Sequence, residues 1–233
     1  MTQLMRPAAD RGHTKIDWLD SRHSFSFGEY YDRNWMHFGP LRVINDDVIA
    51  PGAGFPTHGH QNMEILTYVI EGAVAHRDST GTDGVIQAGE FQLMHAGSGI
   101  RHSEYNHCQT KPTRLLQIWI LPAADGLAPG YQQKNDTNLA PADAWQAIAT
   151  PDGAANTLRI NQDAKVFYAH PTGHLEYQTA PGRLLWIQVA KGTLTVNGTP
   201  LKQGDGLGIT AEEIKIDNPE GAEILLFDLP SED

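Results

Sequence analysis

Cysteine is almost absent from this sequence, since its 233 residues include a single one, Cys108. One thiol excludes a disulfide within the chain and any metal centre built from several thiolates. Metal ligands, if the chain provides them, must therefore come from other residue types, and 11 histidines are present.

Long apolar segments are missing as well. The strongest apolar run, residues 115–121, contains Gln117 and is far too short to cross a bilayer. The first residues, Met-Thr-Gln-Leu-Met-Arg-Pro, lack the apolar core of a signal peptide. We expect a cytoplasmic protein that does not associate with membranes.

Positive charge is scarce. The chain has 17 Lys and Arg residues against 28 Asp and Glu, which gives a formal net charge of −11, and the basic residues form no run. A protein of this charge does not attract nucleic-acid phosphates, so we expect no direct contact with nucleic acid. Hydrophobic residues make up 40% and charged residues 19% of the chain, a balance typical of a packed globular protein.

Short β-type segments with glycine and proline between them dominate the chain. Residues 64–70 and 184–190 are rich in β-branched and aromatic residues, and Asn197-Gly198 is a strong signal for a tight hairpin. Short strands at regular spacing favour an all-β sandwich or barrel.

The β pattern is interrupted over residues 123–156, which are rich in Ala, Asp, Pro, Gln and Asn. Within this stretch, residues 141–148 begin with proline and predict a short helix. We therefore predict two all-β domains, residues 1–134 and residues 135–233, with a short helical linker counted in the second.

Two closely spaced pairs of polar residues stand out in the first half: His58 with His60, and His102 with Glu104. In a strand, side chains two residues apart point to the same face, about 7 Å apart along the chain. Two such pairs on facing strands would bring three imidazoles and one carboxylate to a single point. This is a plausible site for a first-row transition metal.

The ligand types narrow the choice of metal. Imidazole suits zinc, copper, iron and nickel, whereas a carboxylate suits divalent iron and manganese. Four protein ligands complete the shell of a tetrahedral zinc ion, but they leave an octahedral ion with two open positions. An octahedral site of this kind can admit a substrate oxygen beside water or dioxygen.

The same residues resemble known sequence motifs. Residues 52–72 follow the spacing of the first cupin motif, Gly-x5-His-x-His-x3-Glu-x7-Gly, and residues 89–106 resemble a stretched second motif that ends in His-x3-Asn. More specifically, Gly-Ile-Arg-His-Ser-Glu-Tyr-Asn at 99–106 is similar to the pirin family. Arg-Gly-His at 11–13 and Trp-Leu-Asp at 18–20 share this similarity.

The resemblance implies a bicupin, that is, two tandem β-barrel or jelly-roll domains with the second one degenerate. It implies one divalent metal per chain, iron(II), held by His58, His60, His102 and Glu104; zinc, nickel, manganese, cobalt and copper stay open. It further implies a dioxygenase that opens the heterocyclic ring of flavonols such as quercetin with dioxygen and releases carbon monoxide. Glu104 would then also be the general base.

The sequence departs from the family pattern at Gly59, where relatives often have proline. Glu64 occupies the glutamate position of the first cupin motif, but the resemblance assigns the carboxylate ligand to Glu104. We therefore expect Glu64 to support the ligands from behind or to have a structural role. Phe55, Met63 and Phe91 either line a pocket for a flat ring or belong to the core.

The second half repeats the first without its ligands. When Gly72 is aligned with Gly192, Gln178 and Ala180 stand where the first half has its His-x-His pair. We thus expect the metal site in the N-terminal half. The remaining histidines of the two β-rich halves are not expected to be ligands: His76, His95, His107, His170 and His174.

Two other functions stay open. The chain could be a regulatory or binding protein that acts with a protein partner and uses its metal as a structural or redox element. It could also be a different metal-dependent cupin enzyme, such as an isomerase. The fold alone does not separate these functions, whereas metal analysis combined with an oxygen-uptake assay does.

Overall fold

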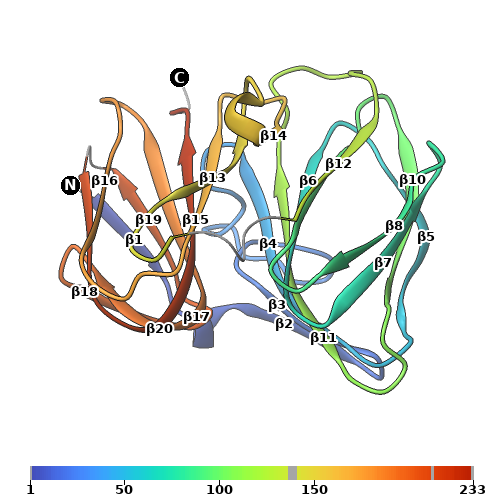
Figure 1. Cartoon of the computed structure of the whole chain (residues 1–233), viewed down its shortest axis with the longest axis horizontal. Helices are drawn as coiled ribbons and strands as arrows, with labels where there is room; N and C mark the ends of the chain where they lie inside the picture. The colour runs from blue at the N-terminus through green and yellow to red at the C-terminus, as the bar shows by residue number, and fades with distance from the viewer. Residues whose placement is uncertain (1, 136–140, 211–212, 232–233) are drawn as a thin grey trace.

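The structure is a computed structural model that describes residues 2–135, 141–210 and 213–231. Figure 1 shows two lobes of β-strands side by side, with the N-terminal half of the chain on the right and the C-terminal half on the left. Among the described residues, the helices are single 3-10 turns at Ala8–Asp10 and Ala154–Asn156. The prediction of an all-β chain with two tandem barrels is confirmed.

Two sheets face each other in the N-terminal lobe. The larger sheet has seven strands in the order β12 (Gly130–Lys134), β9 (Phe91–His95), β6 (Glu64–Glu71), β11 (Thr113–Ile120), β4 (Leu41–Ile49), β3 (Leu19–His23) and β2 (Gly12–Ile16). The smaller sheet has four strands in the order β5 (Gly54–His60), β10 (Ile100–Asn106), β7 (Ala73–Asp78) and β8 (Asp83–Gln87). Strand β6 is buried almost throughout because one of its faces lies in the barrel and the other against the second lobe.

The C-terminal lobe is built on one nine-stranded sheet. Its main path is β1 (Thr2–Arg6), β19 (Gly206–Thr210), β17 (Leu184–Val196), β20 (Glu213–Leu229), β15 (Lys165–Ala169), β13 (Gln146–Thr150) and β14 (Leu158–Arg159). Strand β16 (Leu175–Gln178) pairs with β20, and β18 (Thr199–Lys202) pairs with β17. The hairpin predicted at Asn197-Gly198 joins β17 to β18, with φ of 48° and 79° as a type I′ turn requires.

The first strand of the chain crosses between the lobes. Strand β1 pairs with β19 along its full length, so it belongs to the sheet of the C-terminal lobe (Figure 1). Its partner residues are about 200 positions away in the sequence, as in the pair Thr2 and Thr210. The division into residues 1–134 and 135–233 stays a prediction.

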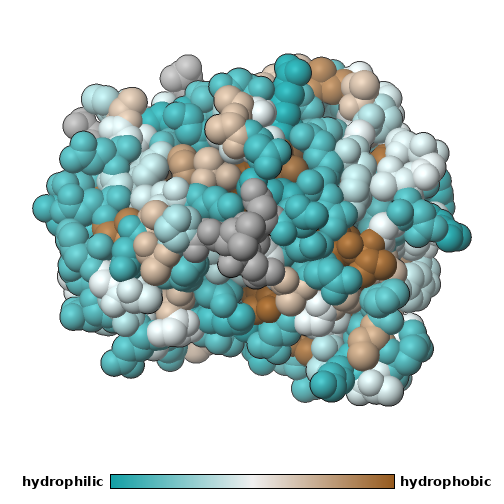
Figure 2. All heavy atoms as spheres, viewed as in Figure 1, coloured by the Kyte–Doolittle hydropathy of each residue, from teal (hydrophilic) through white to brown (hydrophobic). Residues whose placement is uncertain are grey.

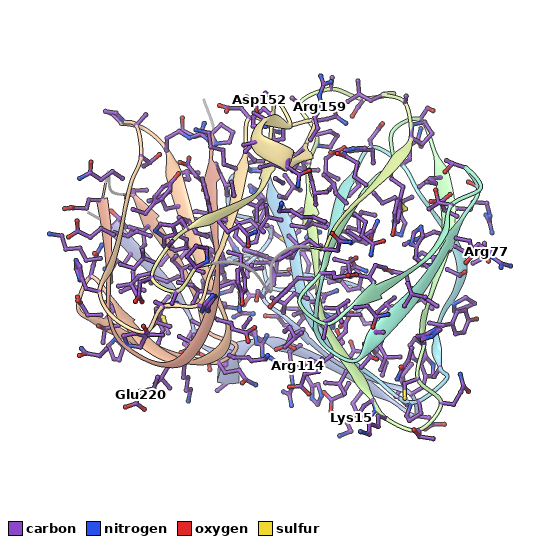
Figure 3. The ribbon with its side chains drawn as sticks, in the orientation of Figure 1. Lys15, Arg77, Arg114, Asp152, Arg159 and Glu220 are labelled. Atoms are coloured by element: carbon purple, nitrogen blue, oxygen red, sulfur yellow. The ribbon has the colours of Figure 1, made fainter. Side chains whose placement is uncertain are left out.

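A shared core joins the two lobes. Trp186 of β17 is fully buried there, and its ring lies 5.0 Å from that of Phe25 and 5.4 Å from that of Phe38. Polar contacts supplement this packing, since Arg114 donates hydrogen bonds to the Asp46 carboxylate of the same lobe and to the Ala190 carbonyl of the other. Figure 3 shows Arg114 near this junction.

The short helix predicted over residues 141–148 is wrong. Residues 141–145 form a turn, and the chain continues directly into strand β13. An isolated helix of two turns is marginal in water, whereas the strand buries Ile148 and Ala149 in the shared core and pairs with β15. Residues 136–140, at the start of the predicted linker, lie outside the described residues.

The face drawn in Figure 2 is mainly hydrophilic, with hydrophobic residues in small separate patches. Within the part of the chain that the structure describes, no helix has both the length and the apolar character needed to span a membrane.

Candidate metal centre

Strands β5 and β10 bring the predicted residues together. They pair antiparallel, which places His102 directly opposite His58. The three histidine rings of His58, His60 and His102 have centroids 4.5 to 4.9 Å apart, and one nitrogen from each lies within 4.8 Å of the others. Three imidazoles therefore converge where the two spaced pairs predicted a metal site.

A proline shapes strand β5 at this point. His102 is opposite His58, but Glu104 is opposite Phe55, so β5 has one residue more than β10 over this stretch. Such a bulge suits Pro56, because proline has no N–H for the ladder and β5 is an edge strand.

The bulge also orients the first ligand. The Pro56 carbonyl lies 2.8 Å from His58 Nδ1, and since a carbonyl can only accept, this nitrogen carries the proton. This leaves Nε2 as the His58 nitrogen that can bind a metal, and it lies 3.1 Å from His102 Nε2. With metal–nitrogen bonds of about 2.1 Å, two ligand atoms at a right angle are about 3.0 Å apart. The separation observed here fits two ligands of one ion.

Burial keeps two of these histidines, His60 and His102, neutral. Burial and the neighbouring imidazoles lower the pKa of His60 to about 4 and the pKa of His102 to about 3. Near neutral pH both rings therefore offer a lone pair rather than a positive charge. Neutral imidazole is the form that binds a metal ion.

Glu104 approaches the site from within the barrel. It is only 2% exposed, and Gln117 donates a hydrogen bond to its Oε2 at 2.9 Å. The Thr67 hydroxyl donates a hydrogen bond of 2.9 Å to the side-chain oxygen of Gln117, and it lies 3.5 Å from Glu104 Oε1. The Glu104 carboxylate forms a cluster with His102 and His76, whereas His58 and His60 form a cluster with His102. His102 is therefore the residue that the two clusters share.

His76 was not expected to contribute to the site, yet it lies directly behind it. Its Nε2 donates to the Asp78 carboxylate at 3.0 Å, both side chains are fully buried, and the ring centroid is 5.4 Å from that of His102. In the pairing of β7 with β10, His76 is opposite Glu104. The His-x-Asp spacing at residues 76–78 is a signal in the sequence that would have pointed to this pair.

A cavity of about 540 Å³ opens beside His58, His60 and Glu104. This volume is in the range of small-molecule sites. Apolar side chains line much of it: Leu19, Phe27, Phe55, Ile65 and Trp119. Of the three apolar residues considered for a pocket, Phe55 lines the cavity, Phe91 lies in the core between the lobes, and Met63 packs against a separate buried cluster.

Comparison with known proteins identifies the family. Residues 5–120 match the family model described as Pirin, and residues 147–229 match the one described as Quercetinase C-terminal cupin domain. The chain is 47% identical over 229 residues to a protein of Escherichia coli (strain K12) named quercetin 2,3-dioxygenase, covering 97% of this chain and 98% of the relative. The chain belongs to the pirin family.

Other pirins and pirin-like proteins are similar over nearly the whole length. A pirin-like protein of Caulobacter vibrioides is 41% identical, with 96% of this chain and 97% of that protein covered. The crystal structure of YhhW from Escherichia coli matches this pirin with a TM-score of 0.95 at 45% identity, covering 99% of each chain. A second structure, of bacterial pirin YhhW in complex with nickel(II), matches with a TM-score of 0.94 at 45% identity, covering 99% and 100% of the two chains.

The donor set of this pirin fits a divalent metal ion. Its histidine nitrogens lie close together, and burial keeps the rings of His60 and His102 neutral. The buried carboxylate of Glu104 lies within 4.8 Å of a His102 nitrogen. Among the described residues, the groups of metal-ligating side chains that lie this close together both belong to the N-terminal lobe. In the second lobe, His170 and His174 lie in loops, as expected.

Glu64 has a different environment in this pirin. Its Oε2 accepts a hydrogen bond of 2.6 Å from His95 and one of 3.0 Å from the backbone N–H of Asn161, in the other lobe. Of the two roles expected for Glu64, this contact between lobes corresponds to the structural one.

Proposed function

We propose that this pirin binds one divalent transition metal, iron(II), through His58, His60, His102 and Glu104. With it, the protein opens the heterocyclic ring of flavonols such as quercetin by reaction with dioxygen, releasing carbon monoxide. One observation carries the proposal: three imidazoles and a buried carboxylate gather beside a cavity with mainly apolar walls. The names of the most similar relatives support the substrate class, and the nickel complex of YhhW supports a divalent ion.

The bound metal would supply Lewis acidity and open coordination positions for a substrate oxygen and dioxygen. The protein's own residues provide the rest. Glu104 would take the proton of the substrate hydroxyl, and the hydrogen bond from Gln117 keeps the carboxylate in place for this transfer.

The cavity walls favour a flat aromatic substrate. Phe27 and Trp119 meet edge to face with centroids 5.3 Å apart, and Phe55 lies on the ligand strand itself. These side chains exclude water from the reacting ring and bind it through its faces.

The test is aerobic incubation of the iron-loaded protein with quercetin, with loss of the substrate absorbance and formation of carbon monoxide both measured. The wild type should consume quercetin, whereas Glu104→Gln should lose most of the activity. Glu220→Gln is the matched control, because Glu220 is exposed on the far lobe (Figure 3). Unchanged turnover in Glu104→Gln would refute the role of this residue. Metal occupancy without oxygen consumption in the wild type would favour a regulatory protein.

A further inference from the structure

The cavity beside the candidate metal centre has a polar wall that the ligand strands do not provide. Strands β3 and β4 place two cross-strand pairs on it, His23 with Asn45 and Ser21 with Asp47. His23 is fully engaged, since its Nδ1 lies 2.8 Å from the Asn45 side-chain oxygen and its Nε2 lies 2.9 Å from the Thr14 hydroxyl. The first pair is thus satisfied within the protein.

Asp47 is not satisfied in the same way. The residue is 2% exposed and lines the cavity, yet its Oδ1 is buried and has no hydrogen-bond partner. Its carboxyl group interacts with the Ser21 hydroxyl. A buried polar atom without a partner is costly in native proteins, so the Asp47 carboxyl group keeps unused hydrogen-bonding capacity at the wall of the cavity.

Asp46, the residue before Asp47, has the cationic partners that Asp47 lacks in the described part of the chain. Asp46, on the opposite face of β4, receives hydrogen bonds from the guanidinium groups of Arg11 and Arg114. No cation is paired with Asp47 among the ion pairs of the described residues. The strand therefore turns one aspartate toward two arginines and the other toward the cavity.

We propose that Asp47 determines substrate specificity, because its carboxyl group hydrogen-bonds a hydroxyl group of a flat polyphenol other than the hydroxyl that would reach the metal. The inference rests on the proposed function and adds which substrates the site selects. The apolar walls would bind the faces of the rings, while the Asp47 carboxyl group would form a hydrogen bond with a hydroxyl group at a ring edge.

The charge around Asp47 agrees with a neutral, hydroxyl-bearing ligand. Burial raises the pKa of Asp47 to about 7, with smaller contributions from the carboxylates of Asp46 and Glu104. Near neutral pH this carboxyl group can therefore donate as well as accept a hydrogen bond.

The experiment measures the binding of flavonols with different numbers of hydroxyl groups to the wild type and to variants at Asp47. Quercetin, galangin (which lacks the hydroxyls of the pendant ring) and 3-hydroxyflavone (which keeps only the 3-hydroxyl) are titrated anaerobically against the metal-loaded protein. Dissociation constants are read from the ligand absorbance. The proteins are wild type, Asp47→Leu, Asp47→Asn and the exposed control Asp125→Asn, with metal content and thermal unfolding measured for each.

We expect the wild type and Asp125→Asn to bind quercetin about 10-fold more tightly than 3-hydroxyflavone, as one hydrogen bond predicts. Asp47→Leu should bind the two ligands within about 2-fold of each other, and galangin shows which ring carries the hydroxyl. Asp47→Asn keeps a donor and an acceptor of the same shape and should retain most of the preference.

Two results would count against the inference and are distinguishable. If the wild type binds flavonols but Asp47→Leu keeps the wild-type ratio of dissociation constants, the role of Asp47 is wrong and the proposed function stands. If the metal-loaded wild type binds none of the three flavonols, the proposed function itself fails and the inference falls with it. A merely structural role of Asp47 would lower stability without changing the ratio.

Discussion

His102 lies directly opposite His58, whereas Glu104, two residues further along the same strand, lies opposite Phe55. The extra residue in β5 is accommodated where Pro56 interrupts the ladder and turns its carbonyl toward His58 Nδ1. Because of this bulge, β5 directs its histidine nitrogens at His102, while Glu104 is opposite His76 on the other neighbouring strand. The geometry of the candidate metal centre thus depends on an irregularity of the sheet.

Replacement of a proposed ligand should lower metal affinity. We expect His58→Ala to weaken binding of divalent iron or nickel by about 100-fold or more, since even changes behind a ligand cost about 10- to 100-fold. Competition with a chromogenic chelator measures this affinity. His107→Ala is the control, because His107 is exposed and lies just after strand β10. Equal affinities of the two variants would exclude His58 from the site.

The buried pair of His76 and Asp78 should support the metal site without binding the substrate. His76→Leu removes the ring that packs behind His102, and we expect metal affinity to fall by about 10- to 100-fold. The same chelator competition, combined with the visible spectrum of the cobalt(II)-loaded protein, tests this. A spectrum and an affinity identical to those of the wild type would show that the pair has no influence on the ligands.

The ion pairs of Asp46 and Asp83 should differ greatly in their effect on stability. Asp46 is largely buried between Arg11 and Arg114, so Asp46→Ala leaves buried guanidinium groups unpaired and should lower the free energy of unfolding by about 3 to 5 kcal/mol.

Asp83→Ala is the matched control. Its partner Arg77 lies at the outer edge of the N-terminal lobe (Figure 3), both side chains are more than half exposed, and the loss should stay below about 1 kcal/mol. Urea unfolding followed by tryptophan fluorescence measures both free energies. Similar losses of unfolding free energy in Asp46→Ala and Asp83→Ala would contradict the prediction that only the buried ion pair matters for stability.

A carboxylate of the C-terminal lobe should make stability dependent on acid pH. Burial opposes ionisation of Asp228, but hydrogen bonds from Thr179, Tyr177 and Arg183 outweigh it and lower the pKa of this group below its usual 3.8. The folded state then binds the proton less readily than the unfolded state. The stabilisation is therefore complete well above pH 4 and is lost as the pH falls through the folded pKa.

The difference in free energy of unfolding between wild type and Asp228→Asn should accordingly be largest near neutral pH and shrink below about pH 4. Unfolding curves at a series of pH values from neutral to acid measure it. A difference that stays constant over this range would show that Asp228 has no shifted pKa. Glu220→Gln, at an exposed position of the same lobe (Figure 3), serves as the reference for changes of charge alone.

Local signals in the sequence predicted much of this pirin. Short segments rich in β-branched and aromatic residues indicated an all-β chain, and Asn197-Gly198 located a hairpin, because both depend on the preferences of adjacent residues. The i and i+2 spacing of His58 with His60 and of His102 with Glu104 placed each pair on one strand face. The helix expected over residues 141–148 was wrong, because burial of Ile148 in the shared core outweighs a weak local preference.

By itself, the sequence determined which residues share a strand and a face, since that period of two is a property of the extended backbone. Only the tertiary structure decided what lies opposite each face. It set His102 against His58, brought His76 behind Glu104, and turned Asp46 to the arginines and Asp47 to the cavity. These relationships arise from pairing between strands far apart in the chain, and a register shifted by one residue would reverse every one of those faces.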